Sequence, residues 1–216
     1  NDAEDPTVKD IEIAWQFDGD APKGGWLLMY TIDGAATPNV IKCQEASAVI
    51  PHRIPGAVYR FTIQAADGTS VLNNTHRYEC PATTVFEQHS LRADTVTAQT
   101  LKTPDDEKWR YETISDSDFT DTFTSGDRIS VVLRAASPFY LPGSETQILY
   151  VYRDTHGNVL SDLISQETVY WKNIWSGGDA KTGELDVPPA PTAPGSYVLH
   201  IYIDGMTMAE IPVTVQ

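Results

Sequence analysis

The segment Pro194–Gly205 constrains the fold of this 216-residue chain more than any other stretch. It opens on Pro194-Gly195, continues with alternating side chains, and closes on Asp204-Gly205, a dipeptide typical of tight hairpin turns. The following segment, Met206–Val215, supplies a returning strand. Successive side chains of a strand point to opposite faces. The apolar face of the strand within Pro194–Gly205 is therefore formed by Tyr197, Leu199, Ile201 and Ile203. The segment therefore predicts a β-hairpin with one buried face.

The same pattern occurs a second time, far upstream in the chain. Pro55-Gly56 precedes Tyr59, the alternation continues to Ala65, and the strand ends at Asp67-Gly68. Two copies of one hairpin pattern, separated by more than half the chain, indicate two β-domains built alike. We predict an all-β chain of two tandem β-sandwiches, and a chain of this length suits two small domains.

The composition is strongly acidic, with 30 acidic against 15 basic residues and a formal net charge of −15. Such a field repels phosphate backbones and anionic lipids, so nucleic acid is excluded as an expected partner. No apolar run reaches the roughly 18 residues that a spanning helix needs, so no membrane insertion is expected. The N-terminal residues lack a basic start and an apolar core, so we expect a mature or excised fragment.

The acidic residues fit either solvated loops of a secreted protein or a calcium site. The candidate oxygen ligands do not match the spacing of an EF-hand loop, and no zinc-type spacing of histidines or cysteines occurs. We therefore predict no metal and no cofactor. The carboxylates considered were Asp18 and Asp20, and separately Asp116, Asp118 and Asp121.

Both cysteines, Cys43 and Cys80, lie in the first half of the chain. Their exclusive presence in one module and the secreted-type composition predict a Cys43–Cys80 disulfide, which would need an oxidising compartment. The alternative is two unrelated buried thiols in a reducing compartment. A Cys-x-x-Cys redox or metal motif is not present in the sequence.

The first part of the chain has Trp15 in an early alternating strand, a second strand at Trp26–Tyr30, and the turn sequence Ile54-Pro55-Gly56-Ala57-Val58-Tyr59. In these features, residues 1–82 resemble a fibronectin type III domain. In that family, a Leu-Pro-Gly-Thr-x-Tyr turn precedes a strand whose Tyr caps the core. Ile54 and Ala57 are mild departures. The resemblance implies a β-sandwich, which we place at residues 1–84, and it implies little about function.

Residues 85–216 are predicted to form a second, larger immunoglobulin-like β-sandwich. The Pro-Gly-Ser-Tyr strand and the Asp-Gly hairpin resemble Ig-like modules in secreted or surface proteins of Gram-positive gut bacteria. Between the two hairpins the order of elements is less regular. Residues 161–175 fit either a short helix that Gly177 ends or an aromatic edge strand.

No motif in the sequence predicts catalysis. A Gly-x-Ser-x-Gly elbow does not occur, and the five histidines lie apart from one another on predicted turns and outward strand faces. We therefore expect that the chain is not an enzyme.

A group of aromatic residues gives the main binding signal, because sugar rings stack on exposed aromatic faces. A glycan-stacking platform is predicted from Trp171 and Trp175, with Tyr170 or Tyr140 at its margin. The alternative is a satellite core beneath a long loop.

These features together predict a non-catalytic spacer or adhesion segment of a larger bacterial surface or secreted protein. Its expected location is extracellular or at the cell surface, its expected state is monomeric, and its partners would be a glycan or a host or cell-wall protein. The alternative function is a carbohydrate-binding module attached to a glycoside hydrolase that lies outside these residues.

Overall fold

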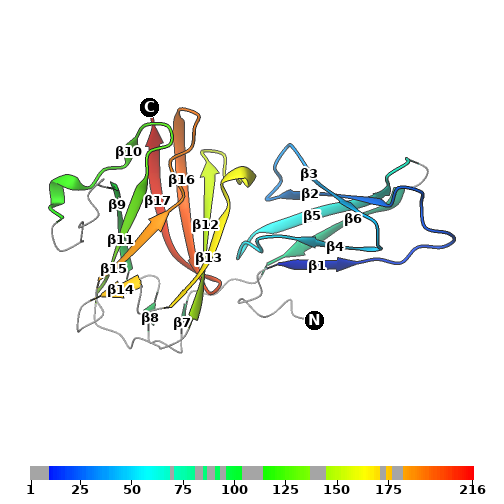
Figure 1. Ribbon diagram of the computed structural model, residues 1–216, viewed down its shortest axis with the longest axis horizontal. Helices are drawn as coiled ribbons and strands as arrows, with labels where there is room; N and C mark the ends of the chain where they lie inside the picture. The colour runs from blue at the N-terminus through cyan, green and yellow to red at the C-terminus, as the bar shows by residue number, and fades with distance from the viewer. Residues whose placement is uncertain are drawn as a thin grey trace. The chain divides into compact units, whose positions relative to one another are not determined.

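The computed structural model (Figure 1) describes residues 10–68, 71–80, 85–86, 91–92, 96–103, 114–136, 145–170, 174–176 and 182–216. The chain divides into two compact units, residues 1–81 and 82–216, and each is described by itself. In the residues that the structure describes, both units consist mainly of β-strands, and the second unit also has short 3-10 turns at Asp116–Asp118 and Ser161–Leu163. The predicted all-β class is confirmed.

The first unit contains two antiparallel sheets built from six described strands. One sheet pairs β1 with β4, and the other has the order β3-β2-β5-β6. If these strands are named B, C, C′, E, F and G in chain order, the sheets read B-E and C′-C-F-G, the arrangement of an Ig-type sandwich. The strands are β1 (Ile11–Ala14), β2 (Trp26–Ile32), β3 (Asn39–Cys43), β4 (Ser47–Ile50), β5 (Val58–Ala65) and β6 (Val71–Glu79).

The core of the first unit follows the alternation in the sequence. Along β2, every second side chain from Trp26 to Ile32 is buried, and Tyr59 on β5 is fully buried. The rings of Trp15 and Phe17 extend this core beyond β1, because both contact Trp26 at centroid distances of 5.9 Å and 4.9 Å. The predicted early strand is therefore present but ends at Ala14, and the half-buried Trp15 packs on the core directly after it.

Tyr59 also fixes the corner that leads into β5. Its hydroxyl donates a hydrogen bond to the carbonyl of His52 (2.9 Å) and accepts one from the amide of Ile54 (3.1 Å). A tyrosine at the start of strand F that bonds back to the preceding backbone is the tyrosine corner of Ig-type sandwiches. This contact gives the Tyr of the Pro-Gly-Ala-Val-Tyr motif its structural role.

The second unit is the larger sandwich, and its strands divide between two main sheets. A five-stranded sheet has the order β10-β17-β16-β12-β13, and a four-stranded sheet has the order β14-β15-β11-β9. A separate small pair joins β7 (Val85–Phe86) to β8 (Leu91–Arg92). The strands of the main sheets are β9 (Val96–Lys102), β10 (Thr122–Phe123), β11 (Ile129–Ala135), β12 (Glu145–Asp154), β13 (Ser165–Tyr170), β14 (Trp175–Ser176), β15 (Thr182–Val187), β16 (Gly195–Ile203) and β17 (Met206–Val215).

The strand order of the second unit is that of an Ig sandwich. The four-stranded sheet reads D-E-B-A and the five-stranded sheet reads A′-G-F-C-C′, in which the first strand is split between the sheets as β9 and β10. Its core lies between the sheets and is formed by the inward side chains of both. Tyr197, at the start of β16, donates a hydrogen bond to the carbonyl of Ala193 (2.8 Å), so a second tyrosine corner is present.

The predicted hairpin at residues 194–215 is confirmed. Asp204 and Gly205 have φ values of 46° and 81°, which is the positive-φ pair that a two-residue I′ turn requires. Leu199, Ile201 and Ile203 are fully buried in the core, and Tyr197 packs against it half-buried. Residues 165–170 form strand β13 at an edge of the sheet, whereas Trp171 and Gly177, on which the helical alternative for residues 161–175 rested, lie outside the described residues.

Proline within strand β17 has a local reason. The amide of Thr214 donates to the carbonyl of Asp121 on the β10 side (2.6 Å), and residues two apart on a strand direct their amides to the same side. The missing N–H of Pro212 would therefore point to the side of β17 that faces β10. The pairing of β10 with β17 does not extend to Pro212, so no ladder hydrogen bond is lost there. This is the edge position at which a strand tolerates proline.

Candidate functional site

The outer face of β12 and β13 in the second unit carries an ordered row of polar side chains. The register places Gln147 opposite Thr168 and Leu149 opposite Gln166. Gln147 donates through Nε2 to Oγ1 of Thr168 (2.8 Å), and Gln166 donates through Nε2 to Oε1 of Gln147 (2.8 Å). These bonds hold the amide groups in fixed orientations at the edge of the five-stranded sheet.

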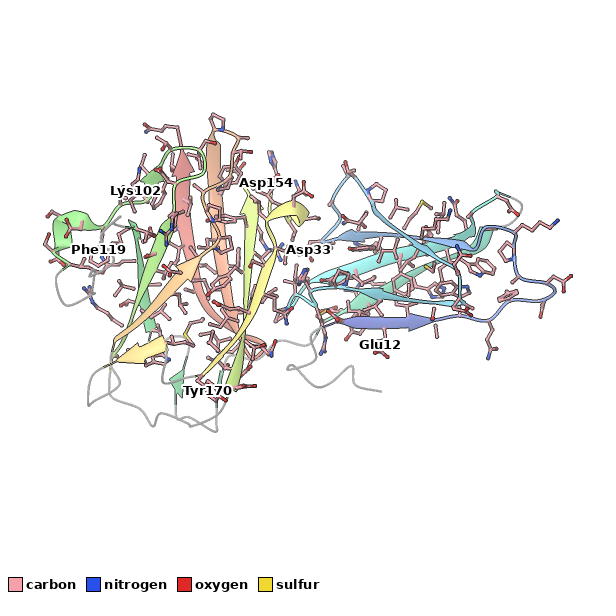
Figure 2. The ribbon with its side chains drawn as sticks, in the orientation of Figure 1. Glu12, Asp33, Lys102, Phe119, Asp154 and Tyr170 are labelled. Atoms are coloured by element: carbon pink, nitrogen blue, oxygen red, sulfur yellow. The ribbon has the colours of Figure 1, made fainter. Side chains whose placement is uncertain are left out.

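Tyr170 stands at the end of this row. Tyr170, which Figure 2 labels, is the last residue of β13. It pairs with Glu145 and is 44% exposed. A half-exposed ring beside oriented amides and hydroxyls is a combination that carbohydrate sites use, because the ring covers an apolar sugar face while polar groups meet its hydroxyls. Of the four aromatic residues predicted for a stacking platform, Tyr170 is the one for which the structure describes an exposed ring.

The hairpin turn of β16 and β17 fixes the start of β12. The Asp204 carboxylate accepts hydrogen bonds from the amide of Gln147 (2.7 Å) and from the hydroxyl of Thr146, and the amide of Asp204 donates to the carbonyl of Gln147 (2.9 Å). Thr146 is buried and Asp204 is half-buried. The turn therefore serves as a fixed support for the row that begins at Gln147.

Glu167 belongs to the same strand but points the other way. Its register partner is the inward-facing Ile148, and its carboxylate accepts a hydrogen bond from the hydroxyl of Tyr150. Burial, together with this bond, raises the pKa of Tyr150 far above its usual value. The phenol therefore stays protonated and keeps donating, which attaches the edge strand to the core.

The middle of this sheet has an apolar outer surface. Leu149, Val151 and Tyr202 point away from the core between the sheets and are nevertheless buried. The ring of His200 lies nearly parallel to that of Tyr202 with centroids 6.1 Å apart, and its Nδ1 lies 3.5 Å from Oε1 of Glu210. The outer face is thus polar toward β13 and apolar over β12 and β16.

Trp175 does not belong to an exposed platform. It is 2% exposed, it is part of the core, and its ring lies over the backbone of Gly183, its partner on β15. A Cβ at Gly183 would lie 2.8 Å from the ring. The prediction of Trp175 as a stacking residue is corrected, and the alternative core interpretation holds for this side chain. Trp171 and Tyr140 lie outside the described residues.

The predicted disulfide is not formed, because both cysteines are free thiols. The register explains why: Cys43 lies level with Trp26 and Ala65, whereas Cys80 follows Glu79, which pairs with Val58 at the other end of β5. At about 3.3 Å per residue, the length of β5 separates these levels by about 23 Å. A disulfide requires Cα atoms within about 7 Å.

The acidic residues predicted as candidate calcium ligands make separate local contacts. The carboxylate of Asp118 accepts a hydrogen bond from the amide of Ser115 (2.8 Å), and that of Asp121 accepts one from the hydroxyl of Thr122 (3.1 Å). Asp18 and Asp20 are exposed in the loop after β1. Within the described ranges, no three His, Cys, Asp or Glu side chains converge on a point that a metal ion could occupy.

The described histidines are equally dispersed. His52 takes part in the corner of Tyr59 through its backbone carbonyl, and His76 stacks on Phe61 with ring centroids 5.3 Å apart. His156 lies in the turn after β12, near Asp154. In the part of the chain that the structure describes, no helix is long and apolar enough to cross a membrane.

Comparisons with known proteins give structural matches at low identity. No protein-family model matches the chain, and no curated protein matches its sequence. Among solved structures, the bacterial integrin-binding protein invasin matches 95% of this chain and 35% of its own, at 10% identity and a TM-score of 0.30. The chain thus spans about a third of the length of that protein.

Two further solved structures are similar to this chain. The fibronectin(III)-like modules of CbhA from Clostridium thermocellum match 96% of this chain and 84% of theirs, at 10% identity and a TM-score of 0.24. The BSP domain of a biofilm-associated protein matches 99% of this chain and 28% of its own, at 14% identity and a TM-score of 0.22. The Ig-type assignment rests on the strand orders and tyrosine corners of the chain itself.

Proposed function

We propose that the chain is a non-catalytic spacer and adhesion segment of a larger bacterial surface or secreted protein, located outside the cell. We place its two sandwich domains at residues 1–84 and 85–216, with a boundary close to that between the compact units 1–81 and 82–216. Tandem Ig-type sandwiches are suited to this role, because each folds around its own core and presents sheet faces and loops to partners. The acidic composition keeps such a chain soluble in an exposed setting.

The observation that carries the spacer role is the parallel pairing of β10 with β17, which we call the terminal clamp. The amide of Thr214 donates to the carbonyl of Asp121, and the amide of Gln216 donates to the carbonyl of Phe123 (3.0 Å). Under tension along the chain, β10 is drawn toward its start and β17 toward its end. Because the strands are parallel, these forces act in opposite directions along the strands and load the bonds together.

Strand β9 precedes the terminal clamp on the same load path. It pairs antiparallel with β11, with Val96 opposite Ala135 at its start. Force applied at the N-terminal end of the second unit reaches this ladder before it reaches β10. The terminal clamp therefore carries the load in the second unit after β9 has been released, which is a useful property for a segment that holds a binding module away from a surface.

Single-molecule force spectroscopy on the whole chain tests the spacer role. Thr214→Pro removes one donor of the clamp, and a net loss of about 0.5–1.5 kcal/mol is expected for one hydrogen bond. Ile211→Val removes a core methyl group for about the same loss without touching the clamp. We expect Thr214→Pro to lower the unfolding force of the second unit clearly more than Ile211→Val. Equal forces for the two variants would refute the clamp.

A second candidate function is a carbohydrate-binding module attached to a glycoside hydrolase. The observation that favours it is the exposed ring of Tyr170 beside the Gln147, Thr168 and Gln166 row. Glycan-array binding by the whole chain tests it, and Tyr170→Ala should abolish the signal while Thr155→Ala, in the exposed turn after β12, leaves it unchanged. Binding that survives Tyr170→Ala would exclude this face as the glycan site.

A further inference from the structure

The outer face of the four-stranded sheet in the first unit combines apolar and basic side chains. Since Trp26, Leu28, Tyr30 and Ile32 point into the core, Leu27 and Met29 point outward, and both are half-exposed. Met29 pairs with Val40, which is 57% exposed and the most exposed of the large apolar residues described. These three side chains form a continuous apolar area across β2 and β3.

Basic residues lie around this apolar area. Lys42 pairs with Leu27 on one side, and Arg60 pairs with Thr31 and with Arg77 on the other. All three basic side chains are exposed, and Arg77 forms an ion pair with Glu79 at 2.7 Å. Neither Lys42 nor Arg60 makes an ion pair with any residue that the structure describes.

This concentration of cations is unusual in the unit that carries it. Residues 1–81 contain eleven acidic and six basic side chains, and three of the six are on this one face. At physiological ionic strength the Debye length is about 8 Å, so a partner in contact with this face is attracted by the local cations more strongly than it is repelled by distant carboxylates of the chain. Arg60 and Arg77 are cross-strand partners, and like charges placed opposite each other cost stability unless an anion lies between them.

The face also has an open backbone edge at β3. The amide of Ala66 donates to the carbonyl of Gly25, and the amide of Asp33 donates to the carbonyl of Val58. By this alternation, the odd-numbered residues of β2 direct their backbone N–H and C=O groups toward β5. The even-numbered residues of β2 therefore bond to Asn39, Ile41 and Cys43. The N–H and C=O groups of Val40 and Lys42 consequently point out of the sheet, where an added strand could pair with them.

We propose that this face, formed by Leu27, Met29, Val40, Lys42 and Arg60, docks an acidic polypeptide of a partner protein. Carboxylates of the partner pair with Lys42 and Arg60, and its apolar side chains cover Met29 and Val40. An acidic polysaccharide fits less well, because the face offers aliphatic side chains and no aromatic ring on which a sugar could stack. The inference names a partner class for the adhesion role proposed above, and its failure would leave the spacer role to the force measurement.

The test is a selection from a random peptide library displayed on phage, performed on the whole chain. Selected clones are then compared on face variants, Val40→Glu and Arg60→Glu, and on matched controls, Val49→Glu and Lys23→Glu. Val49 is 49% exposed but lies on β4 of the other sheet, and Lys23 is an exposed cation in the loop before β2. Heparin is tested in parallel as a polysaccharide probe.

We expect clones rich in Asp and Glu with interspersed apolar residues, bound at least about tenfold more weakly by both face variants and unchanged by both controls. Clones that bind the face variants as well as the unaltered chain would overturn the proposal. Face-dependent clones without acidic residues would overturn the acidic partner. Heparin that binds in a face-dependent manner, with no such clones recovered, would overturn the polypeptide in favour of an anionic glycan.

Discussion

The substitution Tyr59→Phe tests how much of the first unit depends on its tyrosine corner. It removes one hydroxyl, which is bonded to the amide of Ile54 and the carbonyl of His52, and it leaves the buried ring in place. Ile54 is fully buried, so its amide has no access to water once the hydroxyl is gone. An unsatisfied buried backbone group costs about 1–3 kcal/mol.

The same change at two other tyrosines supplies matched comparisons. Tyr197→Phe removes a single bond to the carbonyl of Ala193 at a half-exposed site, for about 0.5–1.5 kcal/mol. Tyr30 is a buried core residue, and its ring centroid lies 6.3 Å from that of Tyr59. The hydroxyl of Tyr30 makes no hydrogen bond with a described residue. We therefore expect Tyr30→Phe to be close to neutral.

The expected loss for Tyr59→Phe is about 2–3 kcal/mol, a large fraction of the roughly 5–15 kcal/mol that stabilises a domain. Hydrogen exchange measured by mass spectrometry across a urea series separates peptides of residues 1–81 from those of 82–216, so each unit reports its own free energy of unfolding. The reasoning is refuted if Tyr59→Phe costs no more than Tyr30→Phe, or if the loss is found in the second unit.

Three other predictions follow from the cores of the two units. Trp175→Ala should lower the stability of the second unit by about 3–5 kcal/mol in urea denaturation, as truncation of a buried aromatic does, whereas an exposed stacking residue would leave it unchanged. Thiol titration in denaturant without reductant should count two free thiols, and in the native state Cys80 should react slowly, because burial raises its pKa to about 11. The free energy of unfolding should fall as the pH rises above about 10, the usual tyrosine pKa, because the unfolded chain releases phenol protons that the folded chain retains. A urea midpoint that does not change between pH 9 and about 11 would contradict this. The tyrosines whose pKa is raised by burial are Tyr30, Tyr59, Tyr150 and Tyr152.

The sequence was informative wherever local rules decide structure. The Asp204-Gly205 turn, the alternation along β16, and the inward faces of β2 and β5 all follow from period-two patterning and from backbone angles that few residues adopt. Strand pairing between distant segments was not accessible in this way. No local signal indicates that β10 pairs with β17, because the two strands are about ninety residues apart and share two registered positions.

The binding surfaces show the same limit. Tyr170 could be proposed from composition, but its exposure depends on β13 being an edge strand, which only the pairing with β12 establishes. The sequence alone does not indicate the basic face of the first unit, because Lys42 and Arg60 are distant in sequence and the chain as a whole is acidic. The face is defined only by the pairing of β3, β2 and β5 in one sheet, which places their outward residues side by side.

The positions of the two cysteines clarify how these sandwiches are held together. In an Ig domain, the second cysteine of the bridge between the sheets follows the corner tyrosine by two residues on strand F. Here that position is Phe61 in the first unit and the fully buried Leu199 in the second. Cys43 is on edge strand β3 and Cys80 follows β6, so neither thiol occupies a bridging position. The two sheets of each unit must therefore be held together by side-chain packing, and the tyrosine corners fix where strands β5 and β16 begin. The loss of a corner hydrogen bond should consequently lower the free energy of unfolding more here than in a domain that a disulfide also stabilises.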